Sequence, residues 1–198
     1  MAKNQTTAPI KSTAKNASVP WLRHDLLWVA AAQFLLVGAY VLTTVIYDSW
    51  NLLPHDAVSQ RWSAACVLIG ISIIVWFATK SLRTSNDLYY RGMLYALVVA
   101  DIIFASYNVF WERGMASKSV MLFAVPILVA AVARSRAALV ATATLCVAAY
   151  SSATVRYFNL HYGEGFRVQL YGEILFYSAL MFVFVAILAV LLRPSSSE

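Results

Sequence analysis

LVVADIIFASYNVFWERG, residues 97–114, is an apolar stretch with a single carboxylate, Asp101, between two runs of hydrophobic residues. The hydrocarbon core of a bilayer is about 30 Å thick and needs about 20 mostly apolar residues per helix. An ionised carboxylate that faced lipid at this depth would cost several kcal/mol, so such a group is either protonated or turned inward. The stretch therefore predicts a transmembrane helix whose Asp101 faces the interior of a helix bundle.

The composition of the whole chain is that of a membrane protein. Of its 198 residues, 61% are hydrophobic and 12% are charged, whereas soluble domains are about half apolar and about one quarter charged. The two cysteines, Cys66 and Cys146, lie far apart and have no CxxC spacing. Neither a disulfide framework nor a zinc site is expected from them.

Six segments are predicted to span the membrane, so the expected fold class is all-α, a polytopic bundle of six transmembrane helices. They are approximately residues 26–47, 63–79, 89–111, 119–133, 137–157 and 168–192. Only Arg134, Ser135 and Arg136 separate the fourth from the fifth, which predicts a tight helical hairpin, because one continuous helix would hold two arginines at mid-membrane. Pro126 is expected to kink the fourth segment.

The ends of the chain have a different composition. Residues 1–20 are rich in Lys, Ser, Thr, Ala and Asn and contain no apolar run, which is typical of a disordered segment. The first apolar run is long enough to span and lacks a cleavage site, so we expect it to remain as an anchor. The predicted organisation is a disordered cytoplasmic tail at 1–20, a membrane domain at 21–194 and a short cytoplasmic tail at 195–198.

The positive charges predict the direction of the spans. One side of the membrane would carry ten, at positions 3, 11, 15, 23, 80, 83, 91, 134, 136 and 193, and the other would carry five, at positions 61, 113, 118, 156 and 167. Cytoplasmic segments are enriched in Lys and Arg, so both termini are expected in the cytoplasm. Much of the net charge of +6 is then a topology signal, and nucleic acid is not expected as a partner.

Polar residues continue outward from Asp101 along the third span. Asn108 is seven residues further on and Glu112 eleven, so at helical spacing all three side chains should share one stripe, with Tyr107 beside it. Intramembrane ionisable residues commonly mark ligand, ion or proton sites. In the alternative interpretation, Asp101 is a packing residue hydrogen-bonded to Gln33, to Ser72 or to a threonine of the fifth span.

Two further charged residues are predicted near the outer surface. Arg156 lies at the end of the fifth span, and Glu173 lies just inside the sixth at about the depth of Glu112. With the stripe, they would line an outward-facing polar cup above Asp101 that binds a small ligand or ion. An interfacial loop that pairs its own charges is the alternative. His161 stands alone in its loop and is expected to be solvated.

Enzymatic motifs are missing from the sequence. It contains no phosphate-binding glycine loop, no GxSxG and no HExxH. The three histidines fall at span ends or in loops, so no pair could hold a haem within the bundle, and no span contains a lysine for a retinal Schiff base. We therefore expect no enzymatic activity, no cofactor and no metal.

The order of segments in residues 90–194 resembles the membrane input region of multi-span bacterial sensor kinases and cyclases, including those similar to the type IV pilus sensor kinase. The resemblance rests on the span with Asp101, the short external turn ERGMASKS (112–119) and the hairpin MLFAVPILVAAVARSRAALVATATL (121–145). In that group the last span leads into a kinase or cyclase domain, whereas this chain ends five residues after Arg193. The resemblance implies a sensor-like module of the bacterial inner membrane that signals to a separate protein partner.

Two other classes remain open. Six short helices with cytoplasmic termini also match the topology of the substrate-capture subunits of vitamin transporters, whose small-residue docking motif is only loosely matched by Ala31 and Ala39. The third class is a structural membrane subunit whose polar residues serve assembly alone.

Overall fold

The computed structural model describes residues 19–50, 52, 55–81, 87–112, 117–161 and 167–192, and within these residues every regular element is helical. The elements are α1 (Val19–Ser49), α2 (His55–Ser81), α3 (Asp87–Trp111), the 3₁₀-helix η2 (Lys118–Phe123), α4 (Ala124–Ala131), α5 (Arg136–Leu160) and α6 (Arg167–Leu191). The predicted all-α class is confirmed for this part of the chain.

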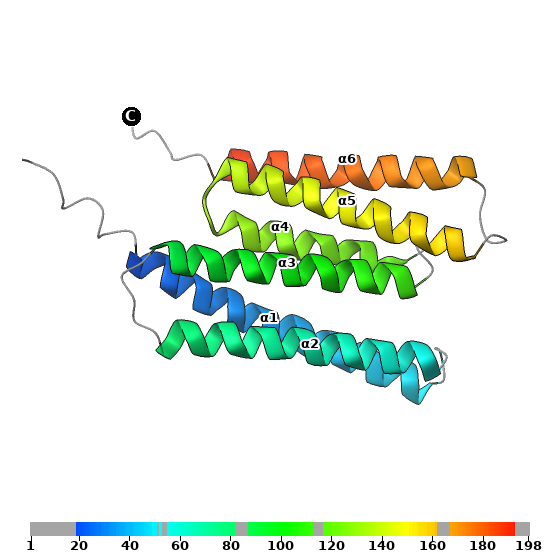
Figure 1. The fold of residues 1–198 in the computed structure, drawn as a ribbon, viewed down its shortest axis with the longest axis horizontal. Helices are drawn as coiled ribbons and strands as arrows, with labels where there is room; N and C mark the ends of the chain where they lie inside the picture. Colours follow the sequence, from blue (N-terminus) through cyan, green and yellow to red (C-terminus); the bar gives the residue numbers. More distant parts are fainter. Residues whose placement is uncertain are drawn as a thin grey trace, which may run out of the picture.

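The helices run side by side in an elongated bundle (Figure 1). α1 packs on α2, α5 packs on α6, and α3 lies between the two pairs, where it also contacts α4. Burial reflects this order. In the most apolar 18-residue stretch of α3, 56% of the residues are buried, against 11% in the corresponding stretch of α6. The helix that carries Asp101 is therefore the centre of the bundle.

Within the described residues, five helices are long and apolar enough to cross a membrane, and so the protein is a multi-pass membrane protein. They cover Trp21–Ser49, His55–Ser81, Asp87–Trp111, Arg136–Leu160 and Leu170–Leu191. The predicted fourth span is instead the shorter apolar segment Lys118–Ala131, made of η2 and α4. At 2.0 Å per 3₁₀ residue and 1.5 Å per α residue, this segment reaches about 24 Å, less than the hydrocarbon core of about 30 Å.

Pro126 accounts for the change of helix type within that segment. It is the third residue of α4, where a missing backbone N–H is tolerated. Its ring would clash with the carbonyl of Leu122 in an α-helix that began earlier, and Leu122 lies in η2. The break expected at Pro126 thus takes the form of a 3₁₀-to-α junction.

The turn between α4 and α5 is as tight as the sequence predicts. Arg134 has a φ of 51°, in the left-handed region that ends a helix, and the Ser135 hydroxyl caps α5 by accepting from the Ala138 amide at 3.4 Å. The Arg134 guanidinium then lies over the Trp21 ring at 4.5 Å and 3.6 Å from Asp25. The hairpin tip is thereby attached to the start of α1.

α1, α3 and α5 begin at the same end of the bundle (Figure 1), and among the described residues more Lys and Arg belong to this end than to the other. Arg23, Lys80, Arg91, Arg134 and Arg136 belong to this end, and Arg61, Lys118 and Arg156 to the opposite end. The Arg23 Nε donates to the Thr79 carbonyl at 3.1 Å, so one of these cations also caps the end of α2. The predicted tails at 1–20 and 195–198 lie almost wholly outside the described residues.

Candidate functional site

Asp101 is 2% exposed and is bonded to α1. The Gln33 Nε2 donates to the Asp101 Oδ2 at 2.5 Å. Of the partners considered for Asp101, Gln33 is the one in contact, while the Ser72 hydroxyl donates to the Leu68 carbonyl of its own helix. The Asp101 Oδ1 and the Gln33 Oε1 are both buried and have no hydrogen-bond partner among the described residues. Both are acceptors, so a proton on the carboxyl would supply the donor they lack.

A second polar contact between the same two helices lies seven residues further along each of them. The Tyr40 hydroxyl donates to the Asn108 Oδ1, and the Asn108 Nδ2 donates to the Phe104 carbonyl at 2.8 Å. In both contacts the residues are 68 positions apart. α1 and α3 run in the same direction (Figure 1), so equal steps of seven, about two helical turns, keep the two bonds in register.

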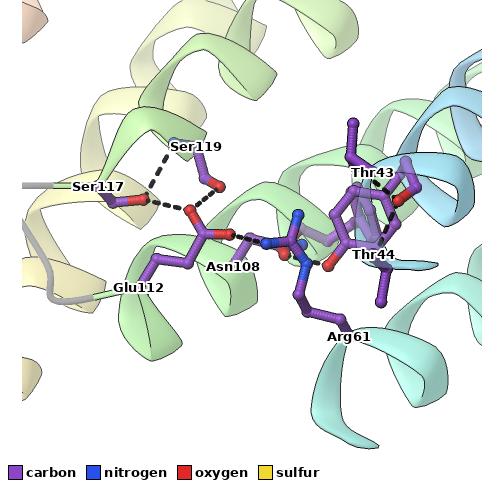
Figure 2. Close-up of polar contacts among 9 residues, drawn as sticks. Thr43, Thr44, Arg61, Asn108, Glu112, Ser117 and Ser119 are labelled. Carbon is purple, nitrogen blue, oxygen red and sulfur yellow. Dashed lines mark hydrogen bonds and ion pairs between the residues drawn. The ribbon is translucent and has the colours of Figure 1, made fainter. Parts of the chain in front are cut away.

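Glu112 forms the third contact of this face, with three partners. Its Oε1 lies 2.9 Å from an Arg61 Nη atom of α2. Its Oε2 accepts from the Ser119 hydroxyl at 2.5 Å and from the Ser117 hydroxyl at 3.1 Å. Figure 2 shows the carboxylate between the two serines and the guanidinium. Glu112 therefore joins α2 to the start of η2, and the predicted stripe of Asp101, Asn108 and Glu112 faces α1 and α2.

The Arg61 guanidinium is held among aromatic rings. It lies 4.7 Å from the centre of the Tyr40 ring and 5.3 Å from that of Tyr47. Only 11% of the Arg61 side chain is exposed, and its Nε has no hydrogen-bond partner among the described residues. Such cation–π contacts hold a cation more strongly where water is excluded. Arg61 is thus fixed in place by the two rings and by Glu112.

These residues surround a pocket of about 570 Å³ at the end of the bundle where α3 ends. Its walls come from α1, α2, α3 and η2. The polar and aromatic side chains of the lining are Tyr40, Tyr47, Gln60, Arg61, Tyr107, Asn108, Trp111, Glu112, Ser117, Lys118 and Ser119. A concave site with a few convergent polar groups among apolar walls is the usual form of a small-molecule site.

Tyr107 lies beside the stripe, as expected, and its hydroxyl donates to the Gln60 Oε1 of α2. Of the predicted site residues, the structure brings Tyr107, Asn108 and Glu112 together in the pocket. Asp101 is not among the lining residues and lies about 10 Å deeper, seven residues below Asn108 along α3.

Arg156 and Glu173 are not brought to this pocket. The exposed Arg156 guanidinium lies 5.5 Å from the centre of the Phe110 ring, on the α5 side of α3. Glu173 belongs to α6, which packs on α5, while α1 and α2 are on the other side of α3 (Figure 1). The sequence places both residues at a suitable depth, but depth alone does not specify the side of the bundle.

Arg61, Tyr40 and Gln60 were not singled out in the sequence, although they form much of the pocket. Arg61 was counted only as a topology charge, and Tyr40 is one of 11 tyrosines. One feature of the sequence could have identified Gln33 and Tyr40 as the partners of Asp101 and Asn108. Gln33 and Tyr40 are seven residues apart, and so are Asp101 and Asn108. Two polar residues at the same interval on two spans would have suggested a parallel pair.

Metal ligation finds no support in the described part of the chain, where no group of three His, Cys, Asp or Glu side chains gathers. His161 stacks on the Tyr157 ring at 4.4 Å, and its Nδ1 lies 3.0 Å from the Tyr157 carbonyl. Comparison of the chain with protein-family models, with curated proteins and with solved structures finds no match. The argument for function therefore depends on the pocket itself.

Proposed function

We propose that this multi-pass membrane protein is a sensor-like module that binds a small molecule in the pocket around Arg61 and Glu112 and signals to a separate partner protein. One observation carries the proposal: a pocket of about 570 Å³ has a nearly buried ion pair in its wall and draws its lining from four elements. A ligand that interacts with Arg61 or Glu112 acts at once on α2, α3 and η2. Such a site can convert binding into a movement of helices.

Asp101 and Gln33 extend this arrangement towards the middle of the bundle. In our proposal, changes at the pocket reach them along α1 and α3, because Tyr40–Asn108 and Gln33–Asp101 join the same two helices. Two buried acceptors that lack a donor in the described part of the chain make this pair sensitive to a proton. Asp101 is then part of the response, although it does not line the pocket.

The proposed orientation has both termini in the cytoplasm and the pocket on the outer side of a bacterial inner membrane. It is supported by the larger number of Lys and Arg residues at the end opposite the pocket. Exposed serines at the two ends allow a test. With Cys66 replaced by serine, a membrane-impermeant maleimide should label Ser59→Cys in intact cells and Ser81→Cys only after lysis. Labelling of Ser81→Cys in intact cells would contradict the orientation.

Ligand binding is tested by purification in mild detergent, followed by mass spectrometry of the small molecules and proteins that remain bound. Tyr47→Ala removes a ring from the pocket beside Arg61, and we expect it to reduce the amount of the bound molecule. The matched control is Tyr171→Ala, which removes an exposed tyrosine of α6 that does not line the pocket. Equal retention by both variants and the wild type would contradict the proposed function.

A further inference from the structure

A second cavity lies beside the pocket, in the groove between α2 and α3. It has a volume of about 320 Å³, and apart from Ser63 and Tyr107 its lining is apolar, with Ala64, Ile71 and Ala100 among the residues. Val67 and Ile103, which also line it, are each 63% exposed. From Ser63 to Ile71 the groove follows α2 for about 12 Å, against about 15 Å for one leaflet of the hydrocarbon core. The groove therefore opens sideways, where acyl chains surround the protein.

The groove and the polar pocket meet at Tyr107. This residue lines both cavities, and its hydroxyl donates to Gln60, which lines the pocket alone. The pocket lies at the end of α3, where Trp111 and Tyr47 are placed at the depth that aromatic side chains prefer at a membrane interface. A molecule with a polar head and an apolar tail can occupy both cavities without leaving its leaflet.

The charges of the pocket specify the polar head. Arg61 and Lys118 against Glu112 leave one net positive charge in the lining. Both oxygens of Glu112 are already bonded, one to Arg61 and the other to the two serines. The cations, in contrast, are available, because Arg61 and Lys118 both line the pocket and Lys118 is exposed. A guanidinium and an ammonium group with a positive net charge favour a phosphate group.

We propose that the ligand of the pocket is an anionic phospholipid, whose phosphate binds at Arg61 and Lys118 and one of whose acyl chains occupies the groove between α2 and α3. The inference rests on the proposed function and names its ligand class. The phosphate balances the net positive charge of the pocket, and the acyl chain covers the apolar lining of the groove. The protein then responds to the lipid composition of the membrane in which it lies.

The test uses native mass spectrometry of the full-length protein in detergent with three probes. These are phosphatidylglycerol, phosphatidylcholine with the same acyl chains, and the soluble headgroup analogue glycerol 3-phosphate. We expect phosphatidylglycerol to bind most tightly. Lys118→Gln should weaken its binding about fivefold, as expected for one cation near anionic lipid. The control, Lys80→Gln, removes an exposed lysine at the opposite end and should have no effect.

The groove is tested separately. Ala64→Phe should fill it and weaken phosphatidylglycerol binding by about tenfold, a difference that the method resolves readily. The matched control is Ala32→Phe, in a groove of about 260 Å³ between α1 and α4 that shares no lining residue with the pocket. If Ala64→Phe does not fold, Lys118→Gln still tests the lipid inference. The Lys118 side chain is exposed, so its replacement should leave the fold intact.

The outcomes separate this inference from the proposed function. If glycerol 3-phosphate binds as tightly as phosphatidylglycerol and is insensitive to Ala64→Phe, the ligand is water-soluble and the lipid inference fails, while the pocket remains the site. Phosphatidylglycerol binding that neither Lys118→Gln nor Ala64→Phe alters would place the lipid elsewhere and also overturn the inference. If Tyr47→Ala changes the binding of no molecule, the proposed function itself fails.

Discussion

Both sides of α3 are packed with apolar side chains, but they differ in their polar contacts. Towards α1 and α2, polar side chains bond in pairs, with Asp101 on Gln33 and Glu112 on Arg61. Towards α4, α5 and α6, the contacts are apolar and aromatic. There the Phe110 ring of α3 meets the Tyr157 ring of α5 at 6.4 Å between centres, in edge-on geometry.

The difference shows that one kind of contact can hold membrane helices close together while another fixes their position along one another. Lipid tails are as apolar as leucine, so apolar contacts between helices hold them close without a strong preference for one sliding position. A hydrogen bond is directional and is lost when a helix slides by one turn. The polar side of α3 therefore sets the register of α1 and α2, and it is also the side where the pocket lies. Three predictions test this division, from the largest expected effect to the smallest.

The largest effect is expected at the ion pair of Glu112 and Arg61, whose side chains are 22% and 11% exposed. Glu112→Ala leaves a nearly buried guanidinium unpaired and frees two serines, so we expect a loss of about 3 kcal/mol in the free energy of unfolding. The measurement is SDS-induced unfolding in mixed micelles. Asp87→Ala breaks the pair with Arg91 at the opposite end, where both side chains are 35% exposed, and should cost less than about 0.5 kcal/mol. Equal losses at the two ends would contradict the special role of the polar side.

The second effect is expected at Asp101. Asp101→Leu leaves the Gln33 amide without a partner in a buried site, so we expect a loss of about 1–3 kcal/mol. Asp101→Asn keeps the size of the side chain and adds an N–H₂ donor, as a protonated acid would, so stability should change by less than about 1 kcal/mol.

The same Asp101→Asn variant also separates function from packing, since it can no longer gain or lose a proton. If Asp101 belongs to the response, this stable variant should lose the coupling between ligand and partner. Wild-type ligand affinity and partner coupling in stable Asp101→Asn would leave Asp101 as a packing residue alone.

The smallest effect is expected from removing single hydroxyl groups. Tyr40→Phe removes the donor to Asn108 while keeping the ring beside Phe104, at 4.9 Å between centres, and should cost about 0.6–1 kcal/mol. Tyr150→Phe is the matched change on the apolar side, where the buried hydroxyl forms no hydrogen bond of normal geometry to a described residue. We expect no loss there. A greater loss for Tyr150→Phe in SDS-induced unfolding would reverse the assignment of the two sides.

Much of the architecture was predictable because it depends on local chemistry. The apolar runs predicted a helical membrane protein, and Arg134, Ser135 and Arg136 predicted the hairpin that the structure contains. The interval between Asp101, Asn108 and Glu112 predicted a shared face of α3. The helix type of the fourth segment was not predictable in this way, because apolar composition does not reveal that Lys118–Phe123, before Pro126, is a 3₁₀-helix.

The partners of the polar residues were decided only by the tertiary structure. Gln33, Ser72 and a threonine of α5 were equally suitable on chemistry, and the parallel alignment of α1 with α3 selected Gln33. The same alignment brought Tyr40 to Asn108, whereas the position of α6 beyond α5 kept Glu173 away from the pocket. Hydropathy and helical spacing specify how deep a side chain lies and which face of its own helix it occupies. The neighbour across that face depends on the order in which the helices pack, and this order is a property of the whole bundle.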